Sequence, residues 1–149
     1  FHFLPFELNP NMANAGEPIA SYFSRQMGWN EDKLLKYQRS LVTTAAKSGV
    51  CIDFSKRTHY YNTLNAHLLM HWAEQFDKQL ELNEALIKAY FKEGQDISNL
   101  AVLLNIAEEL GIPINSSDDP LSSVVLGSGL CLERFEDFKS VLNFSPKPS

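Results

Sequence analysis

The feature that most constrains this chain is a series of helical apolar patterns, each of which ends at a glycine. Between residues 17 and 111, apolar side chains recur at the three- and four-residue spacing of one helix face, and patterns stop at Gly28, Gly49, Gly94 and Gly111. Glycine is favoured just after a helix because it readily adopts the left-handed conformation that ends one. The 149-residue sequence is therefore expected to fold as one mainly α domain.

Residues that favour helix starts divide this region further. Pro18 suits a first helical turn, and Asn30 is a favoured N-cap, followed by acidic residues where the helix dipole favours them. Asp96 or Ser98 is expected to cap the last helix of the region. The side chains expected to face inward are Ile19, Tyr22, Phe23 and Met27 in the first helix, and Leu34, Leu35, Gln38, Leu41, Val42, Ala45 and Ala46 in the second.

The most apolar helix is expected to begin at Leu64. Leu64, Leu68 and Trp72 repeat every four residues and further apolar residues lie beside them, which predicts burial on most sides. Its front end is polar because Asn62 and Thr63 precede it. A further helix is expected near residues 80 to 93.

The two ends of the chain differ from this helical centre. Phe1–Leu8 is expected to form a short strand, and Val50–Phe54 an extended connection or a strand. After Gly111 the composition changes to that of a turn or linker. A final amphipathic helix is expected over Leu130–Leu142.

Composition excludes several kinds of partner. The net charge is −5 with acidic and basic residues interleaved, so the sequence predicts no nucleic-acid partner. No apolar run approaches about 18 residues, so no membrane span is expected. Cys51 and Cys131 form no Cys-x-x-Cys motif and are interpreted as small buried side chains, with a bond between them left open.

Residue patterns by themselves name no reaction. His67 and His71 have the spacing of a zinc-binding helix, but no glutamate follows the first histidine and no third ligand is evident, so neither a metal site nor a cofactor is expected. Asn62 and Thr63 are explained equally by a helix cap. The aromatic pairs at residues 60–61 and 90–91 either line a groove or fill gaps between helices.

Four segments, in order, resemble the DsbA-like thioredoxin-fold proteins, and within them the FrnE-like dithiol–disulfide isomerases. The segments are Pro5-Phe6-Glu7-Leu8-Asn9-Pro10-Asn11-Met12; Asn62-Thr63 with Ala66-His67 and Trp72-Ala73; Ala85-Leu86 with Ala89-Tyr90-Phe91 and Gly94-Gln95-Asp96-Ile97; and Leu103 with Ala107 and Leu110-Gly111. The resemblance implies a DsbA-like region over 1–112, with a short strand, a helical insertion and an incomplete thioredoxin core. It leaves 113–149 as a divergent segment.

The same resemblance implies where a site would lie. The helical insertion would form one wall of a substrate groove lined by Asn9, Asn62, Thr63 and His67, and the partner would be a thiol or disulfide substrate or a glutathione-like ligand. The family's Cys-x-x-Cys motif is absent, so we expect a fragment of a bacterial, cytoplasmic oxidoreductase or isomerase that is inactive as written, with no catalytic residue. Two alternatives stay open: a non-catalytic helical binding module, and a relative of kappa-class glutathione transferases and 2-hydroxychromene-2-carboxylate isomerases.

An incomplete core also predicts self-association. Surface that the missing sheet would cover is expected to be exposed and to join copies into a homo-oligomer, through the Phe1–Leu8 strand or the Leu130–Leu142 helix.

Overall fold

A computed structural model of the chain describes residues 7–13 and 15–114. Its elements, in order, are β1 (Glu17–Pro18), α1 (Ile19–Met27), α2 (Glu31–Lys47), β2 (His59–Tyr60), α3 (Leu64–Glu74), α4 (Gln79–Ile87), the π-helix η1 (Lys88–Lys92) and α5 (Leu100–Glu109). The mainly helical fold is therefore confirmed.

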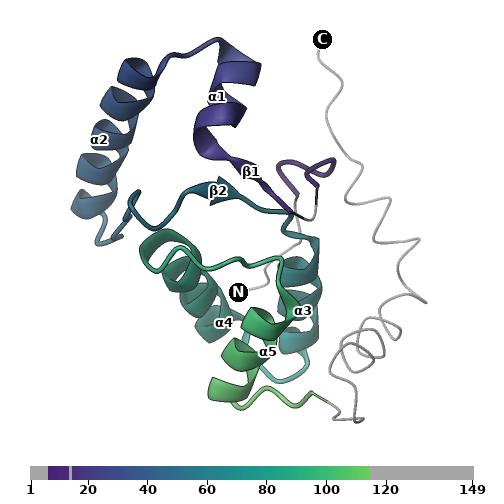
Figure 1. Ribbon diagram of the computed structural model, residues 1–149. Helices are drawn as coiled ribbons and strands as arrows, with labels where there is room; N and C mark the ends of the chain where they lie inside the picture. The colour runs from purple at the N-terminus through teal and green to yellow at the C-terminus, as the bar shows by residue number, and fades with distance from the viewer. Residues whose placement is uncertain (1–6, 14, 115–149) are drawn as a thin grey trace, which may run out of the picture.

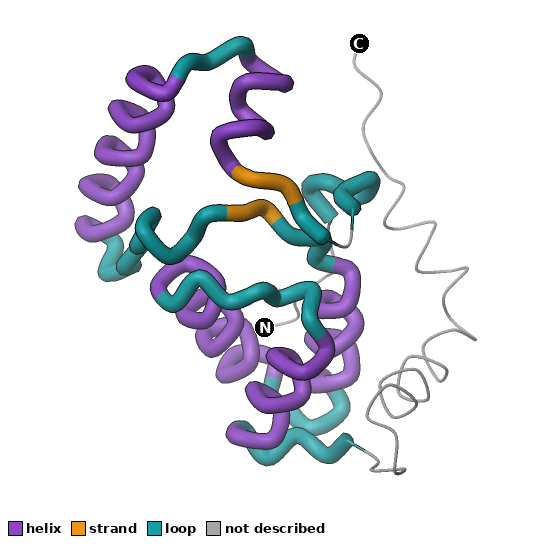
Figure 2. The backbone as a smooth tube through the Cα atoms, viewed as in Figure 1, coloured by secondary structure: helices purple, strands orange, loops and turns teal. Residues whose placement is uncertain are grey.

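The helices form two groups with a small ribbon between them (Figures 1 and 2). Helices α3, α4 and α5 pack together, while α1 and α2 stand on the other side of the ribbon, with α2 at the edge of the molecule. Strands β1 and β2 pair antiparallel, with Glu17 opposite Tyr60 and Pro18 opposite His59. This ribbon ties the first helices to the segment that leads into α3.

The larger core lies among α3, α4, η1 and α5. Its centre is formed by three completely buried side chains, Ala73, Leu82 and Ala107. The side chain of Gln79 is also buried here, and its amide donates a hydrogen bond of 2.9 Å to the carbonyl oxygen of Met70. Because that amide satisfies a backbone acceptor, burying it carries little cost.

Several predicted boundaries are confirmed. Helix α1 ends at Gly28, whose φ of 65° is left-handed, and the Asn30 side chain accepts a hydrogen bond from the Lys33 backbone N–H at the start of α2. Helix α3 begins at Leu64. Helix α5 is capped by Asn99, not by Asp96 or Ser98 as predicted, because the Asp96 carboxylate accepts instead from the Ser98 N–H in the turn before the helix.

Predictions of burial in α1 and α2 were partly wrong. Ile19, Phe23 and Leu34 form a second small core, but Met27 is 56% exposed. In α2 only Leu34 is fully buried, whereas Leu35 and Val42 are exposed. The apolar stripe of α2 is wider than the surface that α1 covers, so part of it faces solvent.

Two short segments also differ from expectation. Val50–Phe54 is not a strand, because residues 50–53 have no regular structure and Phe54 lies in a turn, and the strand lies later, at His59–Tyr60. Glu7 and Leu8 are not in a strand; residues 1–6 of that predicted strand, the Leu130–Leu142 helix and most of 113–149 lie outside the described residues. The division of the chain at residue 112 stays a prediction.

Candidate functional site

The polar front end of α3 is held in place by the side chain of Asn62. Its Oδ1 accepts a hydrogen bond of 2.9 Å from the Leu64 backbone N–H, and its Nδ2 donates one of 2.8 Å to the carbonyl oxygen of Met12. The first bond satisfies one of the free amide groups that begin a helix. The second fastens the turn at residues 9–12 against that helix, so Asn62 acts as a cap and as a tie between distant segments.

Asn9 lies in the turn that Asn62 holds. The Met12 backbone N–H donates to the Asn9 carbonyl oxygen at 3.0 Å, which closes the turn. The Tyr22 hydroxyl donates a long bond of 3.5 Å to the Asn9 side-chain oxygen. Both predicted asparagines are therefore found at one junction, between the turn and the start of α3.

Thr63 and His67 continue this junction along α3. Thr63 precedes the helix and makes no capping bond with its side chain, but its carbonyl oxygen accepts from the His67 backbone N–H at 3.0 Å. Both side chains are half-buried. The four predicted groove residues therefore lie on two adjoining segments, while their role in binding stays a prediction.

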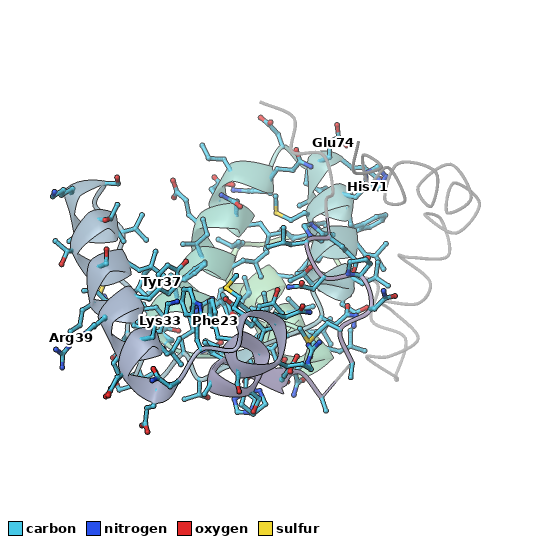
Figure 3. All side chains as sticks on the ribbon, turned by 90° about the horizontal axis from the view of Figure 1, so that it is seen from above. Phe23, Lys33, Tyr37, Arg39, His71 and Glu74 are labelled. Carbon is cyan, nitrogen blue, oxygen red and sulfur yellow. The ribbon has the colours of Figure 1, made fainter. Side chains whose placement is uncertain are left out.

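His71 belongs to a different part of α3. Its Nδ1 lies 3.6 Å from a carboxylate oxygen of Glu74, and Figure 3 shows the two side chains together on the helix. In the part of the chain that the structure describes, no three His, Cys, Asp or Glu side chains gather in a group that could hold a metal ion.

Arg57 is a residue that the sequence interpretation missed. The residue is buried, at 7% exposed, and its guanidinium lies among four aromatic rings. The distances from Cζ to the ring centroids are 5.5 Å for Phe54, 5.2 Å for Tyr60, 4.7 Å for Tyr90 and 4.9 Å for Phe91. Among the described residues, cation–π attraction takes the place of the carboxylate partner that a buried arginine ordinarily needs. Three members of the two aromatic pairs, Tyr60, Tyr90 and Phe91, therefore surround a cation, whereas the ring of Tyr61 stacks on His59.

The rings around Arg57 come from three segments that hydrogen bonds also join. The Asp53 N–H donates a hydrogen bond of 2.8 Å to the carbonyl oxygen of Phe91 in η1, and the Tyr90 hydroxyl donates one of 2.8 Å to the carbonyl oxygen of His59 in β2. Burial raises the pKa of Tyr90 and of Tyr60, and the charge of Arg57 opposes that rise. Both hydroxyls stay protonated at neutral pH.

The signal for this cluster was present in the sequence but weak. Arg57 stands between Phe54 and Tyr60 in a short loop. Arginine is rarely buried unless it is paired, so burial is not the default expectation for such a residue. Tyr90 and Phe91 of η1 are distant from Arg57 in the sequence, so their rings come close to it only when the chain folds.

The described residues do not form a thiol-exchange centre. Cys51 is a free, exposed cysteine that follows the C-terminal end of α2, whereas thiol-exchange enzymes place their nucleophilic cysteine at a helix N-terminus. Its predicted burial was wrong because the connection after α2 that carries it lies on the surface. Cys131 lies outside the described residues.

Comparison with known proteins identifies the class to which this fold belongs. The sequence profile of the DsbA-like thioredoxin domain matches residues 1–128. The chain belongs to the DsbA-like thioredoxin-domain family. It is 31% identical over 109 residues to the uncharacterized protein YwbO of Bacillus subtilis, an alignment that covers 73% of this chain and 50% of that protein.

A solved structure supports the same fold. The crystal structure of a probable DsbA oxidoreductase from Streptomyces coelicolor superposes with a TM-score of 0.69 and 20% identity, over 80% of this chain and 50% of that one. The chain thus spans about half the length of both proteins. Within the described ranges, no helix combines the length and apolar character that crossing a bilayer requires.

Proposed function

We propose that these residues form the helical wall of the substrate groove in a DsbA-like thiol–disulfide oxidoreductase or isomerase of the FrnE-like branch. We propose further that the 149 residues by themselves do not carry out the exchange. One observation carries the proposal: the family match extends over residues 1–128, yet the sequence contains no Cys-x-x-Cys motif.

The chemistry of exchange explains why that motif matters. A thiolate attacks one sulfur of a disulfide, the other sulfur leaves as a thiolate, and a second cysteine resolves the mixed disulfide. A helix N-terminus stabilises the attacking thiolate through its dipole. Cys51 follows the opposite end of a helix and has no second cysteine near it in sequence, so it supplies neither requirement.

What this chain can supply is a surface for a polypeptide substrate. Asn62 holds two adjoining segments together with its side-chain amide, and the amide of Asn9, the hydroxyl of Thr63 and the imidazole of His67 are carried on these segments, close to the larger apolar core that includes Ala66 of α3. Such groups suit an extended backbone, whose amide and carbonyl groups need partners. The proposed partner is therefore a thiol- or disulfide-bearing polypeptide.

An insulin-reduction assay with dithiothreitol tests the absence of exchange. The 149-residue chain and its Cys51→Ser variant are expected to leave the rate of insulin precipitation at that of dithiothreitol alone. A rate several-fold above this background would contradict the proposal. If Cys51→Ser removed that acceleration, it would assign the activity to Cys51.

A further inference from the structure

Helix α2 exposes an apolar line with charges along one side of it. Leu35 and Val42 are seven residues apart, so they lie almost above one another, and they are 43% and 40% exposed. Arg39 and Lys36 stand about 40° and 100° around the helix from Leu35. In Figure 3 Arg39 points away from α1 and the rest of the molecule.

Helix α4 exposes the same arrangement with opposite charge. Leu80 and Ile87 are also seven residues apart, and they are 55% and 38% exposed. Glu84 and Glu81 follow Leu80 at the same offsets that Arg39 and Lys36 have from Leu35. Each helix thus carries an apolar line and a charged flank at matching positions, basic on α2 and acidic on α4.

We propose that α2 of one copy of this chain docks antiparallel on α4 of a second copy. In an antiparallel helix pair, flanks on the same side of the two apolar lines face each other, so the charged flanks meet. A single register then brings Lys36 opposite Glu84 and Arg39 opposite Glu81, and it also brings together one pair with the signs reversed, Asp32 of α2 and Lys88 at the start of η1. The apolar lines pack between the helices in that register, and the helix dipoles oppose each other favourably.

Charge also selects this pairing over the other pairings of the two faces. Two α2 flanks would set Lys36 and Arg39 of both copies against each other, and two α4 flanks would do the same with glutamates, so both repel. Ion pairs within one copy compete only weakly with these contacts between copies. Lys78 reaches Glu81 at 3.1 Å and Lys88 reaches Glu93 at 3.5 Å, but these side chains are solvent-exposed and such pairs are weak.

The proposed contact between α2 and α4 differs from the contacts expected of an incomplete core, which were the Phe1–Leu8 strand and the Leu130–Leu142 helix. The proposal of this contact does not depend on the proposed redox function. Because the contact joins different faces of the two copies, it closes into a dimer when both contacts form reciprocally and otherwise extends as a chain. Either form has a mass above the 16.9 kDa of one copy.

Sedimentation velocity on the full chain at low salt tests the pairing through charge reversal. The wild-type chain is expected to show a mass that rises with concentration and falls again at high salt. Lys36→Glu with Arg39→Glu, and separately Glu81→Lys with Glu84→Lys, are each expected to weaken association about tenfold or more. Circular dichroism spectra equal to that of the wild-type chain are required of both variants, so that loss of association is not loss of fold.

An equimolar mixture of the two variants gives the decisive result. The α2 made acidic in the first variant then faces the α4 made basic in the second. The unchanged basic α2 of the second variant likewise faces the unchanged acidic α4 of the first, so association is expected to return. A wild-type chain that stays monomeric, a variant that associates as wild type does, or a mixture that stays monomeric would overturn the proposal. Loss of association in the α2 variant alone would indicate a different occupant and would also overturn it.

Discussion

The side-chain amide of Asn62 donates a hydrogen bond of 2.8 Å to the carbonyl oxygen of Met12, fifty residues earlier in the chain. The same amide caps α3 through the Leu64 N–H. One side chain therefore sets both the position of the turn that carries Asn9 and the start of the helix that carries His67.

Replacing Asn62 is expected to destabilise the fold. Asn62→Ala removes the cap and leaves a half-buried carbonyl unpaired, so the free energy of unfolding should fall by about 2 kcal/mol. Asn62→Asp keeps the capping oxygen but loses the donor to Met12, and should cost about 1 kcal/mol. Urea unfolding measures both. Asn105→Ala, at an exposed position of α5, is the control and should change stability by less than about 0.5 kcal/mol.

Arg57 is expected to matter for stability although it is charged. Arg57→Ala leaves a cavity among four rings and should lower the free energy of unfolding by about 3 kcal/mol. Arg57→Lys keeps the charge but loses the flat stacking surface, and should cost about 1 to 2 kcal/mol. Chemical denaturation measures the free energy of unfolding of both variants, and Arg39→Ala, at an exposed position, is the control. A cost for Arg57→Ala equal to that of the control would show that the rings pack equally well without it.

Gly94 is expected to tolerate no side chain. Its φ is +66°, and a Cβ there would clash with the carbonyl oxygen of Lys56, in the loop that carries Arg57. Gly94→Ala should therefore cost about 3 kcal/mol or more. Gly28 has φ of +65° and nothing within 4 Å, so Gly28→Ala isolates the backbone strain and should cost about 1 to 2 kcal/mol. If Gly94→Ala and Gly28→Ala lowered stability equally in thermal unfolding, the loop that carries Lys56 would be shown to move away from the added Cβ without cost.

Stability is expected to fall at alkaline pH because of Tyr60 and Tyr90. Burial raises the pKa of both phenols above the ordinary value of 10.0, so the folded chain keeps protons that the unfolded chain has lost. Their contribution is complete below pH about 10 and declines as the pH rises through the folded-state pKa. Tyr60→Phe removes one of these phenols and should make the decline in urea-unfolding stability shallower. An unchanged slope from about pH 9 to 11.5 would rule out Tyr60 as a contributor.

Local signals in the sequence were enough to predict much of the fold. Pro18, Gly28 and Asn30 act through bonds and dihedral angles within one turn of chain, so the ends of α1 and the start of α2 were predicted correctly. The start of α3 at Leu64 follows for the same reason. The four segments that resemble DsbA-like proteins also indicated the family that the profile match confirms.

Features that depend on distant segments were not predictable in this way. Periodicity shows that one side of α2 is apolar, but it does not show how much of that side α1 covers, so Leu35 and Val42 were expected to be buried. The bond between Asn62 and Leu64 is local and follows from capping rules, whereas the bond to Met12 needs the fold. Arg57 was missed for the same reason, because η1 supplies two of its rings.

The groove wall is tested most directly by nuclear magnetic resonance of the ¹⁵N-labelled chain, titrated with an unfolded, cysteine-free polypeptide. We expect chemical-shift changes that saturate and cluster at Asn9, Asn62, Thr63 and His67, and that weaken in His67→Ala. The same titration of Arg39→Ala, altered on α2, should match wild type. Shift changes confined to other surfaces, or no changes at millimolar polypeptide, would contradict the assignment of this face as the wall of a substrate groove.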